Sequence, residues 1–95
     1  MKLITIDGSI WTSAEDFYSA LLPALDAPDW HGHNLDALYD SLSGGINGVE
    51  PPFHVVIQNS RHLPNDMASF LGKVVTMFED ARREFDADIS LKIIS

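Results

Sequence analysis

Three short apolar runs, spread along the whole chain, constrain the fold most. They cover residues 3–6, 53–57 and 89–94, and they are rich in the β-branched residues that favour strands. Two stretches with the apolar spacing of helices follow the first run, and one long stretch follows the second. Strands alternating with helices form parallel sheets through right-handed crossovers. The order predicts an α/β fold, a three-stranded parallel sheet with about three to four packed helices, in a single domain over residues 1–95.

The first predicted helix has recognisable ends. Thr12 or Ser13 can cap its start, and Thr12 with Glu15 has the spacing of a capping box. Pro23 lacks a backbone N–H, so we expect this helix to kink or end near Leu22.

The last predicted helix is the longest. We expect Asn65 or Asp66 to cap it and the helix to run to about Glu84. Apolar residues recur in it at helical spacing and predict a buried stripe, made of Met67, Phe70, Leu71, Val74, Met77 or Phe78, Ala81 and Phe85.

A short helix is predicted between these two, over about residues 34–43. Asn34 is a good N-cap, and Gly44-Gly45 can supply the left-handed stop. The spacing of its leucines predicts one packed face, made of Leu35, Leu38 and Leu42.

The opposite face of this helix is acidic, since Asp36 and Asp40 lie nearly opposite the leucines. Asp36 falls in the first turn, where the helix dipole favours a carboxylate, so a structural role explains it. Asp40 falls in the second half, four residues from a like charge, which costs an isolated helix about 0.2–0.5 kcal/mol. This unfavourable pair of like charges has no compensating feature in the sequence, which indicates that Asp40 belongs to a functional site.

The charge of the chain indicates the kind of partner. Fourteen acidic residues against six basic ones give a net charge of −8, and residues 26–40 hold four carboxylates with no lysine or arginine. Such a surface repels nucleic acid and anionic membranes and attracts basic proteins. Trp30 and His31 precede these carboxylates, and an aromatic residue there is typical of either an interface anchor or a lid on the core.

Several function classes lack support in the sequence. There is no cysteine, and therefore no disulfide, thiolate nucleophile or cysteine zinc site. We find no phosphate-binding glycine motif and no serine nucleophile motif, so we expect no catalytic residues and no cofactor. The N-terminal apolar run is too short for a signal peptide. We expect a cytoplasmic protein, monomeric when free, with no nucleic-acid or membrane partner.

The run Gly32-x-Asn34-Leu35-Asp36-Ala37-Leu38-Tyr39-Asp40-x-Leu42 resembles the barstar family, the intracellular inhibitors of barnase-type ribonucleases. That family commonly has an aromatic pair followed by G-x-N-L-D-A-L-W-D, and Trp30 and His31 take the place of the pair. The order of elements and the length agree along nearly the whole chain. The resemblance implies a barstar-like fold and an inhibitor of a basic ribonuclease. It also implies that the carboxylate of Asp40 enters the phosphate site of the nuclease.

A set of partner-binding residues follows from the acidic face and the resemblance. It consists of Trp30, His31, Asn34, Asp36, Tyr39, Asp40, Ser43, Gly44, Asp80 and Glu84. The last two repeat the acidic spacing on the long helix, where barstar-like proteins carry two glutamates. Nearby, Glu79 is expected to form a solvated ion pair with Arg82 or Arg83.

Two alternatives remain open. A metal site could form from His31, His33, Asp29 and Asp36, because imidazole and carboxylate ligands suit zinc. Otherwise we expect both histidines to be polar residues at the rim of the acidic surface. The chain could also be an acidic protein-interaction module with no nuclease target.

Overall fold

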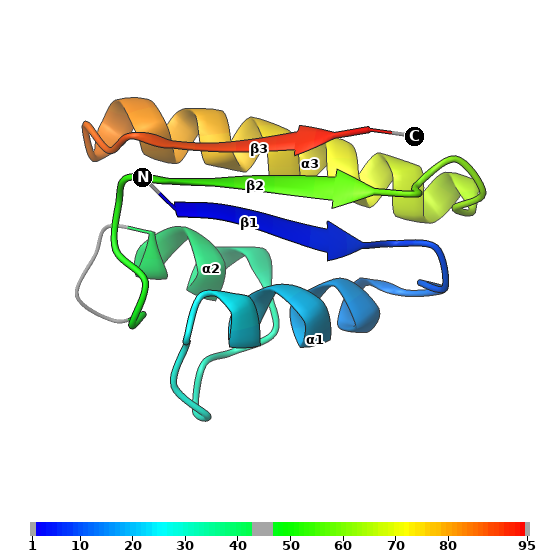
Figure 1. Cartoon of the computed structure of the whole chain (residues 1–95), viewed down its shortest axis with the longest axis horizontal. Coiled ribbons are helices and arrows are strands. Elements are labelled where there is room, and N and C mark those ends of the chain that lie inside the picture. Colours follow the sequence, from blue (N-terminus) through cyan, green and yellow to red (C-terminus); the bar gives the residue numbers. More distant parts are fainter. Residues whose placement is uncertain (1, 43–46, 95) are drawn as a thin grey trace.

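The computed structural model describes residues 2–42 and 47–94. Six elements follow one another in the predicted order (Figure 1): β1 (Lys2–Asp7), α1 (Ala14–Ala24), α2 (Leu35–Ser41), β2 (Phe53–Gln58), α3 (Asn65–Glu84) and β3 (Ile89–Ile93). The strands form one sheet in the order β1-β2-β3, and both strand pairs are parallel. The predicted α/β fold with a three-stranded parallel sheet is therefore confirmed.

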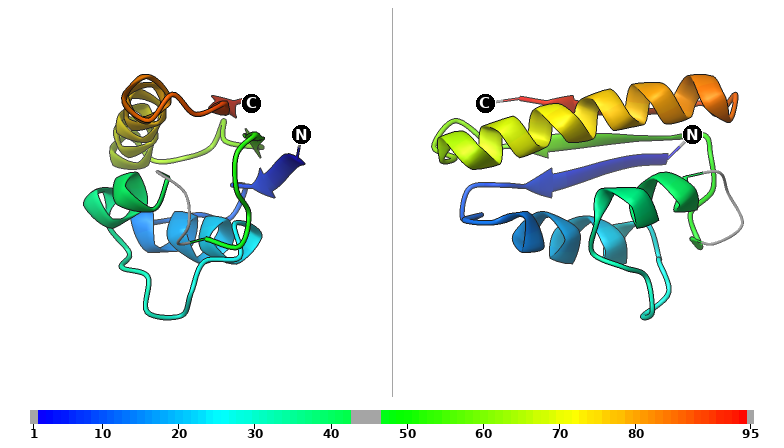
Figure 2. Two further views of the ribbon diagram at one scale, coloured as in Figure 1. Left: turned by 90° about the vertical axis from the view of Figure 1, so that its left-hand side faces the viewer. Right: turned by 180° about the vertical axis from the view of Figure 1, so that it is seen from behind.

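All three helices cover the same face of the sheet (Figure 2). Side chains of successive strand residues point to opposite faces, and only alternate positions are fully buried. Ile4, Val55 and Leu91 stand in register across the three strands and point toward the helices. The other face carries residues that are exposed or only half-buried, among them Thr5 and Val56.

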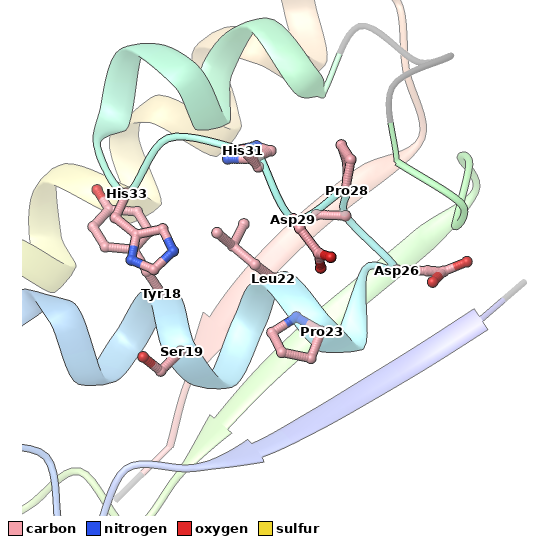
Figure 3. Close-up of a pocket in the computed structure, with 10 residues that line it drawn as sticks. Tyr18, Ser19, Leu22, Pro23, Asp26, Pro28, Asp29, His31 and His33 are labelled. Carbon is pink, nitrogen blue, oxygen red and sulfur yellow. The ribbon is translucent and has the colours of Figure 1, made fainter.

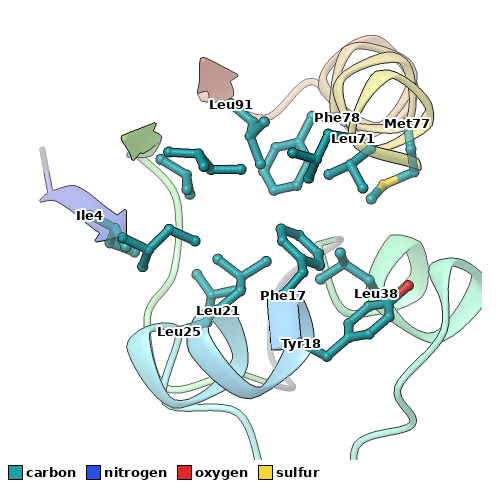
Figure 4. Close-up of a cluster of buried hydrophobic side chains, with 14 of the residues drawn as sticks. Ile4, Phe17, Tyr18, Leu21, Leu25, Leu38, Leu71, Met77, Phe78 and Leu91 are labelled. Carbon is teal, nitrogen blue, oxygen red and sulfur yellow. The ribbon is translucent and has the colours of Figure 1, made fainter. Parts of the chain in front are cut away.

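The core lies between the sheet and the helices (Figure 4). Phe17 of α1 is fully buried, and its ring makes edge contacts with Trp11, Tyr18 and Phe70. Leu38 of α2 is also fully buried. Burying a leucine or phenylalanine side chain contributes about 1.5–3 kcal/mol, so these residues hold α1 and α2 in place.

At the start of α1 the cap is one of the two predicted residues, but the capping box differs from the prediction. Its N-cap is Ser13, and the Asp16 carboxylate accepts hydrogen bonds from the backbone N–H groups of Thr12, at 2.7 Å, and Ser13, at 3.3 Å. The predicted capping box of Thr12 with Glu15 is wrong. Pro23 lies inside the helix, which ends at Ala24, two residues after the predicted end near Leu22. A proline so close to the C-terminus removes only one helical hydrogen bond, so two more residues can follow the helical path.

The longest helix, α3, has the predicted buried stripe but not the predicted cap. Its N-cap is Pro64, which makes no side-chain cap hydrogen bond, so neither Asn65 nor Asp66 caps it. Proline suits a helix start because its φ angle is preset and the first N–H groups have no helical partner. The stripe is confirmed, with Phe70 and Phe85 half-buried at its margin and a buried set made of Met67, Leu71, Val74, Met77, Phe78 and Ala81.

The short helix α2 is shorter than the predicted 34–43. It ends at Ser41, with Leu42 as C-cap in the right-handed region. The predicted stop at Gly44-Gly45 lies outside the described residues, as do Ser43 and Gly44 of the predicted binding set. Over residues 2–42 and 47–94, no helix is both long and apolar enough to cross a membrane.

Candidate protein-binding site

The helix α2 presents its carboxylates to solvent, as the sequence predicts. The side chain of Asn34 caps it, because Asn34 Oδ1 accepts a hydrogen bond from the N–H of Ala37 at 2.8 Å. Leu38 faces the core, so Asp36 and Asp40 are left exposed on the outer side. The assignment of the two faces is confirmed, while binding through Asn34 itself stays a prediction.

Tyr39 connects α2 to the end of α3. It is half-buried, and its ring packs on Phe85 with the ring centroids 5.1 Å apart. Burial raises the pKa of the Tyr39 hydroxyl, and the negative charges of Glu84, Asp80 and Asp40 raise this pKa further. The fold therefore gathers three carboxylates from two helices around one hydroxyl. We call Tyr39, Asp40, Asp80 and Glu84 the acidic cluster.

One carboxylate of the acidic cluster pairs with a basic side chain on its own helix. Asp80 pairs with Arg83 at 2.5 Å, and both side chains are more than half exposed, so the pair contributes little to stability. Arg83 thus pairs with Asp80, and in the part of the chain that the structure describes Glu79 forms no ion pair with Arg82 or Arg83. The predicted pairing of Glu79 is wrong.

Trp30 stands at the surface beside α2. Its side chain is 76% exposed, so it is a candidate interface anchor and not a lid on the core. A hollow of about 200 Å³ separates it from α2 and is lined by Trp30, His31, Gly32, Ala37, Asp40 and Ser41. The fold therefore places an exposed indole and the Asp40 carboxylate on the walls of one hollow.

The two histidines of this loop differ from each other. His31 is only 5% exposed, so its prediction as a rim residue is wrong. Its Nδ1 lies 2.7 Å from the carbonyl oxygen of Gly32, and its Nε2 is buried without a hydrogen bond in the described structure. His33 is exposed, as predicted, with Nδ1 2.7 Å from a carboxylate oxygen of Glu15 and its ring stacked on Tyr18.

The histidines also border a second, larger hollow between α1 and the loop that precedes α2 (Figure 3). Its volume is about 500 Å³, and its lining includes Tyr18, Leu22, Asp26, Asp29, His31 and His33. No three histidine, aspartate or glutamate side chains of the described residues come together as metal ligands. The alternative site of His31, His33, Asp29 and Asp36 is not assembled.

Sequence reasoning missed the polar support beneath α2. Ser41 is buried, and its hydroxyl donates to the carbonyl of Leu38 at 2.8 Å and accepts from Asn47 Nδ2 at 3.1 Å. These bonds attach the end of α2 to residue 47 of the following loop. A serine in a short amphipathic helix gives no sign of such a role in the sequence.

Fold and site together define an acidic α/β domain whose exposed carboxylates, framed by aromatic rings, suit the binding of a basic protein. The sequence matches the family described as barstar (barnase inhibitor) over residues 1–94. It is also 31% identical over 93 residues to a Bacillus subtilis (strain 168) protein named "Putative ribonuclease inhibitor YrdF", and the match covers 98% of this chain and 99% of that one. The chain belongs to the barstar family.

Proposed function

We propose that this protein is a stoichiometric inhibitor of a basic ribonuclease and that it acts by covering the RNA phosphate site with its acidic cluster. The observation that carries the proposal is the exposed position of Asp40 on the outer face of α2, beside a hollow lined by Trp30, with Asp80 and Glu84 near enough to raise the pKa of Tyr39. Membership of the barstar family and the name of the Bacillus relative supply the class of partner.

The mechanism needs no chemical step. Basic ribonucleases bind RNA through lysine and arginine side chains that contact phosphates, and clustered carboxylates carry the same sign of charge as those phosphates. A net charge of −8 steers the protein toward a basic cleft and raises the rate of association. The cluster then occupies the place of the substrate, so inhibition is competitive with RNA.

Slow dissociation requires groups that become buried in the complex. Asp40 is suited to this role because the hollow beside it is lined by the indole of Trp30. An aromatic wall excludes water from a charge pair, and a pair shielded from water is stronger than one at an exposed rim. Tyr39 offers a hydroxyl donor and acceptor beside the same carboxylates. The protein would act as a monomer in the cytoplasm, where it would protect RNA.

The experiment is a titration of a panel of small basic ribonucleases, barnase included, with the purified protein. We expect complete inhibition of at least one enzyme at a ratio of one to one, and weaker inhibition at higher salt. Asp40→Ala, in the same titration, should inhibit far less. If no enzyme of the panel binds, the proposal is overturned. Binding without loss of ribonuclease activity would favour the acidic interaction module.

A further inference from the structure

His31 combines deep burial with an unsatisfied nitrogen. Its Nδ1 lies 2.7 Å from the carbonyl oxygen of Gly32, which can only accept, so Nδ1 carries the proton in the neutral ring. Nε2 then presents a lone pair. It is buried, yet it makes no hydrogen bond to any described residue. An acceptor left in this way destabilises the folded protein, so a donor supplied from outside the chain would be stabilising there.

The position of the ring indicates where that partner comes from. The ring of His31 lines the 200 Å³ hollow together with Trp30 and Asp40. A carboxylate, an imidazole and an exposed indole thus border a space with room for one side chain. On its other side the ring borders the larger hollow, where the titratable neighbours are Tyr18, Asp26, Asp29 and His33.

We propose that Nε2 of His31 accepts a hydrogen bond from the same partner arginine that pairs with Asp40, so that His31 helps to determine which partner is bound. This inference rests on the proposed function. Arginine fits best because its guanidinium has five N–H donors in one plane. One edge can bond the Asp40 carboxylate and the flat face can stack on Trp30, while another donor bonds Nε2, which is buried in the free protein and must become accessible on binding.

A pH dependence follows from this geometry. Protonation of His31 adds an N–H at Nε2, so the acceptor becomes a donor and faces the donors of the arginine. The titratable residues that share the two hollows with His31 are Asp40 in the smaller one and Tyr18, Asp26, Asp29 and His33 in the larger one. Affinity should therefore fall as the pH is lowered.

The main test is His31→Phe, which keeps a flat ring and removes the bare nitrogen. The free variant should unfold at the same denaturant concentration as wild type or at a higher one, because an unsatisfied buried acceptor is removed. At about pH 8 its affinity for the ribonuclease that the wild type inhibits should fall about tenfold or more, as expected for a lost bond to a charged donor. The fall in wild-type affinity from about pH 8 to about pH 6 should be absent in this variant.

Two further variants separate binding from structure. His31→Gln supplies an acceptor that does not titrate, so it should bind more tightly than His31→Phe and without the pH dependence. His33→Phe is the matched control, because His33 is exposed and bonds Glu15. It should keep both the affinity and the pH profile of the wild type.

Nitrogen NMR of the imidazole tests the premise without any ribonuclease. In the free protein at about pH 8, Nδ1 of His31 should be protonated and Nε2 bare. A proton on Nε2 there, a markedly destabilised His31→Phe, or wild-type affinity in His31→Phe would each overturn the inference. The proposed function would still stand in these cases if Asp40→Ala lost affinity. If the wild type binds no ribonuclease, both the proposed function and the inference about His31 are overturned.

Discussion

Helices α2 and α3 each carry two carboxylates four residues apart, but they hold these charges in different ways. α3 has twenty residues, a basic last turn and an arginine that pairs with Asp80. α2 has seven residues, none of them basic. A helix this short is not stable alone in water, so it depends on its cap and on the burial of leucines. Asp36 supports the start of this helix, whereas Asp40 lies in its second half, near the negative end of the helix dipole, which favours a binding role for Asp40.

The largest expected effect is on binding and comes from Asp40→Ala. Truncating one partner of a buried ion pair costs at least about 2–5 kcal/mol, as measurements on the barnase–barstar complex illustrate, so the dissociation constant should rise at least roughly thirty- to several-thousand-fold. The free variant should be as stable as wild type or slightly more so, because a like charge near a helix C-terminus is removed. A ribonuclease titration and a thermal melt, each at two salt concentrations, measure these effects.

Asp36→Ala is the matched control on the same face of α2. Its loss of affinity should be smaller, because part of its role is to start the helix. If Asp40→Ala melts lower and inhibits as tightly as wild type, Asp40 is a structural residue.

The next effect concerns the support of α2 by the core. Leu38 is fully buried, so Leu38→Ala should lower the free energy of unfolding by roughly 2–5 kcal/mol. Leu35→Ala, at a half-buried position one turn earlier, should cost clearly less. Denaturant midpoints measure both. A loss well under about 1 kcal/mol for Leu38→Ala would mean that the faces of α2 are assigned the wrong way round.

A smaller difference in stability is expected between changes at the N-terminus of α2 and at the N-terminus of α3. Asn34 bonds the N–H of Ala37, so Asn34→Ala should destabilise the protein by about 1 kcal/mol. α3 starts at Asn65 without a side-chain cap bond, so Asn65→Ala should change stability by less than about 0.5 kcal/mol. Equal losses in chemical denaturation would contradict the view that α2 depends more on its cap.

The smallest expected effect is a change in the pKa of Tyr39 in the acidic cluster of the free protein. Glu84→Gln should lower the pKa of Tyr39, because a nearby negative charge disfavours the phenolate. Tyrosine ring-carbon NMR during a pH titration measures this shift, and Asp36→Asn serves as the control that should not change it. An unchanged pKa in Glu84→Gln would show that the two helices do not share one cluster.

The raised pKa of Tyr39 also predicts how the stability of the free protein changes at alkaline pH. Its folded pKa lies above the ordinary 10.0, so the folded state favours the neutral hydroxyl. The resulting stability is fully present below pH 10.0 and is lost as the pH rises through the folded value. Tyr39→Phe should therefore lose less stability than wild type between neutral and alkaline pH, as measured by denaturation.

The exceptions to the sequence predictions lie mainly where local patterns compete with tertiary contacts. Glu15 has the spacing of a capping residue, but Asp16 caps α1 and Glu15 pairs with His33 instead. Arg83 could bond Glu79 or Asp80 with similar spacing along the helix, and the folded structure decides for Asp80. Spacing alone does not rank two such partners, because their energies differ by only tenths of a kcal/mol.

The three strands, the faces of α2 and the buried stripe of α3 could be predicted from the order of residues, because burial of apolar residues follows the period of each element. The packing of the helices, by contrast, places Tyr39 near carboxylates from two helices and buries His31 with a bare nitrogen. Both features arise where α2 and the loop before it pack against α1 and α3. Contacts between residues distant in the chain leave no periodic pattern, so these features could not be predicted from the order of residues.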